Sequence, residues 1–159
     1  MYKKKDFIFM DVFNNKGKKI GYINDILIDC HKEKVIGFNI IPKRFFKKNM
    51  SVLKEDIVYY NNTMVIRKIA RYKSLGFSEI NNMDVIDNKG NVIGIVEDII
   101  FDEYTFQIHA IIVSVGFLKR FTEGKKIILL KDILFGERNL LNFNCSNMIN
   151  FYCKLKISI

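Results

Sequence analysis

An internal repeat is the sequence feature that most constrains the fold of this chain. Residues 10–40 align with residues 83–113 at a constant shift of 73, without a gap, and eleven positions are identical. The identical pairs are Met10/Met83, Asp11/Asp84, Val12/Val85, Asn15/Asn88, Lys16/Lys89, Gly17/Gly90, Ile20/Ile93, Gly21/Gly94, Asp25/Asp98, Ile26/Ile99 and Asp29/Asp102. Compositional bias would not place glycines, aspartates and apolar residues in one register. The chain therefore contains two copies of one small unit.

The alignment resumes further on at a shift of 76. There the tripeptide Lys-Arg-Phe at 43–45 aligns with the same tripeptide at 119–121, and Asp56-Ile57 aligns with Asp132-Ile133. The three added residues fall around Ser114–Leu118, which predicts a loop, because insertions collect in loops. Two copies are too few for a solenoid, so duplicated domains are the better description. A unit of roughly 55 to 60 residues is near the lower limit for an independent core, and the copies are expected to pack on each other.

Within each copy the sequence predicts short strands joined by tight turns. Strand-like stretches at 7–13 and 80–86 are followed by Asn-Asn-Lys-Gly and Asp-Asn-Lys-Gly, which favour hairpin turns. Runs rich in β-branched residues follow, with partial alternation, so the fold class is mainly β, a small antiparallel barrel or sandwich per copy. The predicted divisions are a first module at 1–66, a linker at 67–78, a second module at 79–136 and a C-terminal tail at 137–159 that packs on the modules.

The glycines and aspartates shared by the copies are interpreted first as turn residues. Asp near a strand end accepts backbone N–H bonds, while Gly permits positive φ in a turn or marks a bend within a strand. The predicted structural residues are Gly17, Gly21, Asp25, Asp29, Gly90, Gly94, Asp98 and Asp102. The alternative makes the aspartates metal ligands or an acid–base pair. Duplication favours the structural interpretation, because both copies need the same turns.

The pattern from Asp11 to Asp29, and again from Asp84 to Asp102, resembles the PRC-barrel domain. It consists of an apolar strand, an Asp/Asn-x-x-Gly turn, x-Ile-Gly-x-Ile/Val-x-Asp and then Ile/Phe-Asp. The Leu-x-x-Asp-Ile stretches at 53–57 and 129–133 lie where modules of that family usually end. The resemblance covers roughly 1–66 and 79–136 and is nearest in layout to bacterial tandem-barrel proteins. It implies two small antiparallel β-barrels in tandem that serve as interaction modules, and it carries over no catalytic residue.

A basic-aromatic loop, also present in both copies, is the predicted binding surface. Positive charge interleaved with phenylalanine suits phosphate contact with base stacking, or insertion at an anionic membrane surface. The candidate binding residues are Lys43, Arg44, Phe45, Lys47, Lys48, Lys119, Arg120 and Phe121. The alternative is a solvated loop whose phenylalanines fold back into the core.

Composition narrows the classes of function. The 26 Lys+Arg against 17 Asp+Glu give a net charge of +9, which suits anionic partners, although codons of an AT-rich genome would also enrich lysine. No apolar run approaches the ~20 residues of a membrane span. Three cysteines without a Cys-x-x-Cys pair argue against a secreted disulfide framework. The expected location is the cytoplasm, and peripheral association with the membrane is left open.

No recognisable catalytic grouping accompanies these features. The sequence suggests no Ser-His-Asp or Cys-His arrangement, no metal-ligand spacing and no P-loop, so neither a cofactor nor a metal is predicted. The leading hypothesis is a non-enzymatic adaptor that presents strand edges and loops to a protein partner. The alternative is binding to RNA, the ribosome or an acidic membrane through the basic-aromatic loops, and homo-oligomerisation stays open.

Overall fold

The structure is a computed structural model that describes residues 1–43, 50–115 and 124–151 of the 159-residue chain. Most of its regular elements are strands, which confirms the predicted mainly β fold. The chain divides into two compact units. The first is made of Met1–Glu79 and Phe101–Ile108, and the second of Ile80–Ile100 and His109–Ile159. The units therefore do not coincide with the two sequence copies, because a short piece of the second copy belongs to the first unit.

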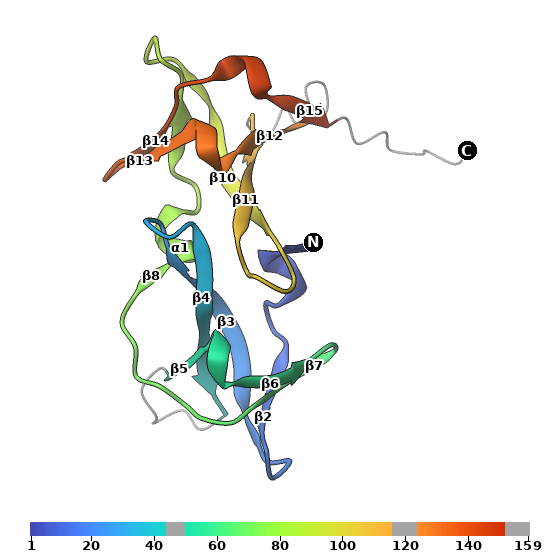
Figure 1. Cartoon of the computed structure of the whole chain (residues 1–159). Coiled ribbons are helices and arrows are strands. Elements are labelled where there is room, and N and C mark those ends of the chain that lie inside the picture. Colours follow the sequence, from blue (N-terminus) through green and yellow to red (C-terminus); the bar gives the residue numbers. More distant parts are fainter. Residues whose placement is uncertain (44–49, 116–123, 152–159) are drawn as a thin grey trace, which may run out of the picture. The chain divides into compact units, whose positions relative to one another are not determined.

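One sheet contains the seven strands of the first copy and its linker (Figure 1). Its spatial order is β5-β4-β3-β2-β7-β6, with β8 paired to β3. The bounds are β2 (Asp11–Asn14), β3 (Lys19–Asp29), β4 (Lys34–Pro42), β5 (Met50–Leu53), β6 (Ile57–Tyr60), β7 (Thr63–Ile66) and β8 (Leu75–Gly76), with short helices η1 (Lys4–Asp6), η2 (Lys54–Asp56) and α1 (Phe77–Ile80). Neighbouring strands are antiparallel except β2 and β7, where Asp11 lies opposite Thr63 in a parallel pair. That parallel pair was not predicted from the turns, because it joins strands far apart in the sequence.

The other sheet repeats this arrangement with strands of the second copy. Its order is β13-β14-β9-β10-β11-β12-β15, and β1 pairs with β10. The bounds are β1 (Tyr2–Lys3), β9 (Asp84–Ile86), β10 (Val92–Phe101), β11 (Ile108–Ser114), β12 (Lys125–Leu129), β13 (Ile133–Phe135), β14 (Asn139–Asn142) and β15 (Ile149–Phe151), with helices η4 (Leu130–Asp132) and η5 (Cys145–Asn147). β14 pairs in parallel with β9, as β7 does with β2. The sequence comparison ended the second module at residue 136, whereas the sheet continues through β14 and β15.

The first hairpin turn is built in the same way in both copies. The side-chain oxygen Oδ1 of Asn14, and that of Asp87, accepts backbone N–H bonds from the residues two and four positions further on, at 2.8–3.0 Å. Gly17 and Gly90 follow in the left-handed region, with φ of +73° and +82°. A residue with a Cβ would be strained at those positions. The Asn/Asp-x-x-Gly pattern thus sets the hairpin.

A second pair of glycines lies where two strands approach closely. A Cβ added to Gly21 would lie 2.0 Å from the carbonyl oxygen of Ile41, and one added to Gly94 would lie 2.5 Å from that of Ser114. Both distances are too short for any side chain. The strand glycines are therefore required by the neighbouring backbone of β4 and β11.

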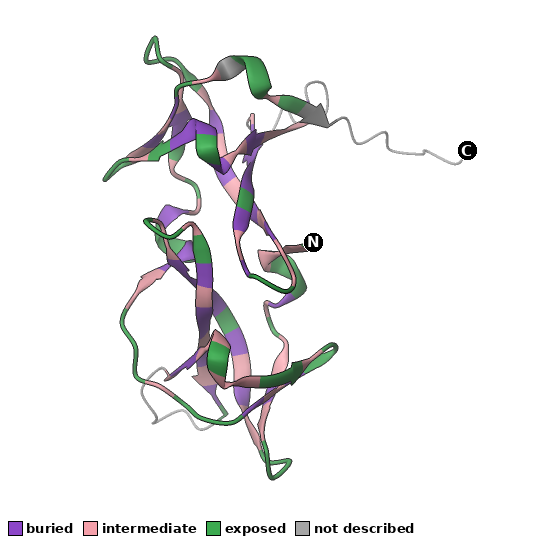
Figure 2. Cartoon of the chain, viewed as in Figure 1, coloured by how far each residue is buried: buried purple, intermediate pink, exposed green. Residues whose placement is uncertain are grey.

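Aromatic residues from both copies form the core of the first unit, where buried residues line the middle of β3 and β4 (Figure 2). The rings of Phe7 and Phe38 stack at 4.8 Å, and Phe101 lies 5.6 Å from Phe7. Phe106 contacts Phe38 at 6.1 Å and Tyr60 at 6.0 Å. The four phenylalanines are almost fully buried. The second copy therefore contributes two large side chains to this core.

Backbone hydrogen bonds hold the same piece of the second copy in place. The N–H of Val35 donates to the carbonyl of Phe106 at 2.9 Å, and the N–H of Ile108 donates to the carbonyl of Glu33 at 2.7 Å. Tyr60 Oη donates to the carbonyl of Glu103 at 2.7 Å. The turn between β10 and β11 is thus part of the first unit.

Candidate interaction surfaces

Asp29 and Asp102 lie at the turns that follow the long second strand of each copy. Each accepts backbone N–H bonds from the residues two and three positions further on, at 3.1 and 3.0 Å for Asp29 and at 2.9 and 2.7 Å for Asp102. The bond from Lys32 is the main cause that holds the pKa of Asp29 below its ordinary value of 3.8. Both carboxylates thus act as acceptors for turn backbone.

Asp25 and Asp98 are buried, and each accepts the N–H of the following residue, at 2.9 and 2.8 Å. Asp25 also accepts the hydroxyl of Ser78 at 2.6 Å and the backbone N–H of Ser78 at 3.1 Å, at the start of α1. No group of three or more His, Cys, Asp or Glu side chains within residues 1–43, 50–115 and 124–151 is placed to hold a metal ion. The hydrogen bonds of Asp25 tie β3 to the first turn of α1.

The predicted basic-aromatic loops fall mostly outside the described residues. Those outside are Arg44, Phe45, Lys47, Lys48, Lys119, Arg120 and Phe121. Lys43 is described, and its backbone N–H donates to the carbonyl of Ile20 at 3.0 Å. Lys43 and Met50, the residues on either side of the undescribed 44–49 segment, both line one pocket in the first unit. The predicted binding residues between 44 and 48 are therefore flanked in sequence by two residues that line this pocket.

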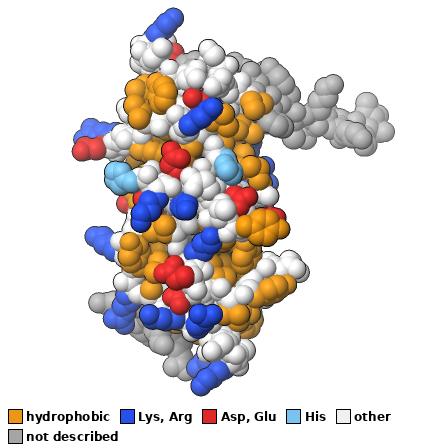
Figure 3. All heavy atoms as spheres, in the orientation of Figure 1, with side chains coloured by type: hydrophobic (Ala, Val, Ile, Leu, Met, Phe, Trp, Pro, Cys, Tyr) orange, Lys and Arg blue, Asp and Glu red, His pale blue; other side chains and the backbone are white. Residues whose placement is uncertain are grey.

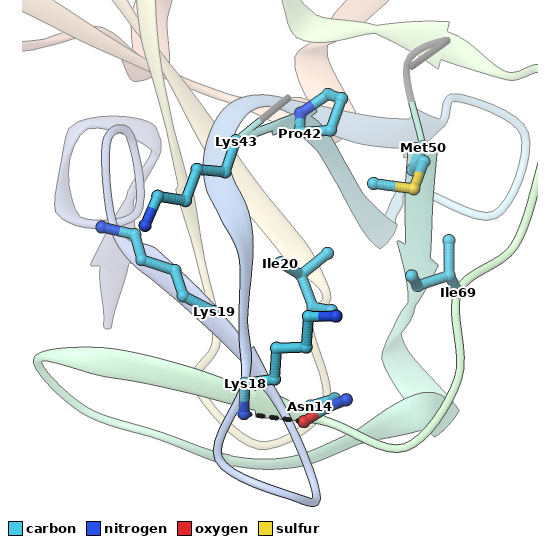
Figure 4. A pocket seen from close by; sticks show the side chains of 8 residues that line it. All are labelled: Asn14, Lys18, Lys19, Ile20, Pro42, Lys43, Met50 and Ile69. Atoms are coloured by element: carbon cyan, nitrogen blue, oxygen red, sulfur yellow. Dashed lines mark hydrogen bonds between the residues drawn. The ribbon is translucent and has the colours of Figure 1, made fainter. Parts of the chain in front are cut away.

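That pocket has a volume of about 610 Å³ and lies beside the first hairpin (Figure 4). Its lining residues are Asn14, Lys18, Lys19, Ile20, Pro42, Lys43, Met50 and Ile69. The Nζ atom of Lys19 lies 2.5 Å from Oδ2 of Asp11. Lys and Arg side chains are interspersed with hydrophobic ones on the face drawn in Figure 3. The pocket combines ammonium groups with an apolar lining, which is a composition suited to an amphipathic ligand.

Two of the three lysines of the pocket, Lys18 and Lys19, belong to the first copy alone. At the shift of 73, Lys18 corresponds to Asn91 and Lys19 to Val92, while Ile20 is retained as Ile93. Duplication therefore explains the strand and its turn but not the two lysines. Lysine at positions where the second copy has Asn91 and Val92 is the signal that the sequence offers for this difference.

Phe9 is an exposed aromatic residue with an unfavourable backbone conformation. Its φ is +68°, its side chain is 74% exposed, and its ring lies 6.1 Å from that of Tyr22. The corresponding residue of the second copy is Asn82, with φ of +67°, and Asn adopts this conformation more readily than Phe. Such strain costs on the order of 1 kcal/mol and often marks a functional surface. Because Tyr22 pairs with Asp11 across the strands, the aromatic pair borders the Lys19–Asp11 ion pair.

The outer edge of β13 is a second candidate surface, since β13 is the end strand of its sheet. Leu134 lies opposite Leu141 of β14. The N–H of Phe143 donates to Asp132 on one side of this pair, and the N–H of Gly136 donates to Asn139 on the other. Antiparallel pairs alternate, so the backbone groups of the two intervening residues of β13 point away from β14. A row of outward backbone groups is a template for another strand.

The residues concerned are Ile133 and Phe135. The N–H of Ile133 donates to Leu130 at the end of η4, which leaves the carbonyl of Ile133 and both backbone groups of Phe135 at the open edge. The side chain of Leu134 between them is 57% exposed. Among described residues no strand lies on this side of β13.

β6 is the corresponding end strand of the first sheet, but its edge is irregular. Its exposed residues Val58 and Tyr59 correspond to Leu134 and Phe135. The pairing with β7 shifts between Ile57 and Tyr59, so Val58 is an extra residue that bulges from the strand. Edge bulges disfavour the addition of another strand. β13, which has no such shift, is therefore the better template.

Sequence reasoning named neither Phe9 nor the β13 edge. The apolar run Ile-Leu-Phe at 133–135, followed by Gly136, was a signal for a strand. Its place at the end of a sheet depends on the parallel β9–β14 pair, which no local pattern indicates.

Three further findings complete this description. No helix in the described part of the chain is long and apolar enough to cross a bilayer. A search among curated proteins gives no match. A family model described as the PRC-barrel domain matches the chain twice, over residues 1–72 and 73–138. PRC-barrel domains are interaction modules, generally without catalytic activity. The two matches follow the two duplicated sheets, and the chain therefore belongs to the PRC-barrel domain family, with two such domains in tandem.

Proposed function

We propose that this protein is a non-enzymatic adaptor that binds an extended segment of a protein partner at the open edge of β13. The observation that carries the proposal is the outward backbone of Ile133 and Phe135 beside the exposed Leu134. An added strand would form hydrogen bonds with three of these backbone groups, and its side chains would contact Leu134. Strand addition of this kind gives affinity through the main chain and selectivity through side chains.

The partner segment is expected to be apolar and free of proline at the pairing positions. Leu134 offers only aliphatic surface, so a β-branched or aromatic residue opposite it would bury the most apolar area. The net charge of +9 favours acidic residues on either side of such a segment, because opposite charges speed association.

The test is capture of partners from native cells by the wild type and by three variants. Phe135→Pro removes the outward N–H but no bond to β14, since Pro is tolerated on the open side of an edge strand. Phe135→Val is the matched control, because it alters the side chain and keeps the N–H. Leu134→Lys changes only the exposed side chain. We expect any partner of this edge to be retained by Phe135→Val and reduced at least about tenfold by the other two variants.

The result that contradicts the proposal is equal capture of every protein by wild type and Phe135→Pro, with both folded by circular dichroism. Capture that ribonuclease treatment abolishes would favour the alternative, in which RNA binds the basic-aromatic loops at Lys43 and Lys119. A dimer that Phe135→Pro dissociates would instead assign the edge to a second copy of this chain. Each outcome is measured on the same preparations, so the three interpretations separate.

A further inference from the structure

The solvent-facing side of the second sheet carries a continuous row of four aliphatic side chains. Leu134 of β13 lies opposite Leu141 of β14, which in turn lies opposite Ile86 of β9. Ile86 lies opposite Val92 of β10, so this aliphatic row crosses four neighbouring strands. Residues directly opposite each other in register share one face of a sheet. The side chains at the two ends of the row, Leu134 and Val92, are 57% and 60% exposed.

The neighbours of these residues along the strands point to the core. Val85 and Leu140 are fully buried, and Ile133 is 6% exposed. Because side chains alternate along a strand, the residues of the aliphatic row point away from that core. The second sheet therefore has one apolar side turned to the core and a further apolar row turned to solvent.

The first copy differs at one end of this row. Lys19 occupies the position of Val92 there, and its ammonium group lies 2.5 Å from the carboxylate of Asp11. Asp84 aligns with Asp11 and is exposed, but the second copy offers it valine in place of that lysine. Within the described ranges, no Lys or Arg side chain lies at ion-pair distance from Asp84. The second copy thus combines a wholly aliphatic row with a carboxylate that has no ion-pair partner.

The dimensions of the aliphatic row indicate the shape of its ligand. Neighbouring strands lie about 4.8 Å apart, so the ends of a four-strand row are about 14 Å apart. A helix laid across the strands advances about 5.4 Å per turn, and three turns of an apolar stripe match that length. A strand laid along the row would place its same-side residues about 6.7 Å apart and would match the spacing poorly. A row one side chain wide is also far smaller than the ~800 Å² that each partner contributes to a standard interface, which disfavours a second copy of this chain.

The unpaired carboxylate disfavours a lipid surface as the ligand. Asp84 lies two residues before Ile86 on β9 and opposite Ile95 of β10, so it shares the outer face with the aliphatic row. Insertion of this face among lipids would remove the carboxylate from water without a partner, which is costly. A helix covers only the row, and a Lys or Arg beside its apolar stripe would pair with Asp84.

We infer that the outer face of β13, β14, β9 and β10 binds an amphipathic helix of a protein partner. The helix lies across the strands and contacts the aliphatic row with apolar residues at i, i+4, i+7 and i+11, while a basic residue beside them pairs with Asp84. This site uses side chains of the sheet face, whereas the proposed strand addition uses the backbone edge of β13. The inference therefore goes beyond the proposed function, and either can fail alone.

The test is a selection of helical peptides on the full chain. The probe is a phage-displayed library of helix-forming peptides, about 18 residues long, with random residues on all sides of the helix. We expect the enriched peptides to share apolar residues at helical spacing, with Lys or Arg beside the apolar stripe. Absence of enrichment would overturn the inference. Enrichment only of peptides whose apolar residues alternate with a period of two would overturn it as well, because that pattern indicates strand pairing.

Variants connect the binding to this face, with synthetic copies of the selected peptides measured by fluorescence anisotropy and folding checked by circular dichroism. Val92→Lys introduces the lysine of the first copy, which interrupts the aliphatic row and offers Asp84 an internal partner. We expect it to weaken binding at least about tenfold. Asp84→Asn should weaken binding about two- to fivefold, the usual range for one exposed ion pair. Equal affinity of wild type and Val92→Lys would overturn the inference.

Two control variants separate this site from other effects. Tyr104→Lys adds the same charge as Val92→Lys at a side chain that is 80% exposed in the first unit, and it should leave the peptide affinities unchanged. Phe135→Pro should also leave them unchanged, since it alters only the backbone edge of β13. Equal weakening by Tyr104→Lys and Val92→Lys would show only a general charge effect and would contradict the assignment.

The other possible occupants are tested on the same preparations. Sedimentation velocity of the full chain detects a second copy, and co-sedimentation with phosphatidylcholine vesicles that contain about one fifth phosphatidylglycerol detects a lipid surface. We expect Val92→Lys to change neither the oligomeric state nor the vesicle-bound fraction. A dimer that this variant dissociates would assign the face to a second copy, and vesicle binding that it abolishes would assign the face to a bilayer. Either result would overturn the inference of a helix.

Discussion

Tyr60 shows how one residue links the two copies. Its hydroxyl donates to the carbonyl of Glu103, and its ring packs on Phe7 and Phe106. Burial is the main cause that raises the pKa of this phenol to about 12, from an ordinary value of 10. The folded state therefore favours the neutral phenol, and this contribution to stability is complete below pH 10 and is lost as the pH rises from 10 through 12.

We predict that Tyr60→Phe lowers the free energy of unfolding by about 1 kcal/mol at neutral pH, the net value of one hydrogen bond. The difference between wild type and variant should shrink as the pH rises through 10–12, because only the wild type loses the neutral phenol. Urea unfolding at several pH values measures both effects. A difference that grows with pH would mean that the hydroxyl is not held neutral by the fold.

At the residue scale, local sequence patterns were sufficient to predict the fold class. The mainly β fold followed from the spacing of glycines, aspartates and apolar runs, and the turn aspartates do accept backbone N–H bonds in the structure. Phe9 escaped notice, since nothing in its neighbours shows that its φ is positive. Of the three pocket lysines, Lys43 was among the predicted binding residues, whereas Lys18 and Lys19 were not predicted, because they lie at positions where the copies differ.

At the scale of elements, the turn between β10 and β11 differs from the corresponding turn of the first copy in the side chain that it buries. Phe106 is buried in the first unit with φ of +62°, while the aligned Glu33 of the first copy has φ of +54° and is not buried. The two turns share a backbone conformation but differ in what they bury. A phenylalanine aligned with a glutamate was the sequence signal for this difference.

We predict that Phe106→Ala destabilises the protein by about 3–5 kcal/mol, the usual cost of removing a buried phenylalanine. Tyr104→Ala is the matched control in the same turn, since the Tyr104 side chain is 80% exposed, and it should change stability by less than about 0.5 kcal/mol. Thermal or urea unfolding compares the two. Similar small effects would show that the Phe106 ring is not part of the core in solution.

The pairings between strands that are distant in the chain could not be predicted from the sequence. β7 and β14 each pair in parallel with the first main strand of their copy, and these pairings determine which strands lie at the sheet ends. Turn residues determine the pairing of consecutive strands, but they say nothing about strands joined by long connections. The edge of β13 was for this reason found only in the structure.

For the whole molecule, the assignment of residues 101–108 to the first unit means that the first copy does not contain its complete core. Phe101 and Phe106 are nearly fully buried against Phe7, Phe38 and Tyr60. Loss of two such side chains would cost roughly 6–10 kcal/mol, which is comparable to the roughly 5–15 kcal/mol that stabilises a typical domain. We therefore expect the first module not to fold without residues 101–108.

We predict that a fragment of residues 1–80 does not fold cooperatively, although it contains all of the first family match. Its aromatic cluster would be open to water, because the fragment lacks the β10–β11 turn. Circular dichroism during heating and amide dispersion in NMR spectra measure this directly against the full chain. Adding a peptide of residues 99–110 should restore part of the structure, and a peptide with Phe101→Ala and Phe106→Ala should not. A fragment that unfolds cooperatively at the temperature of the full chain would show that each module is complete in itself.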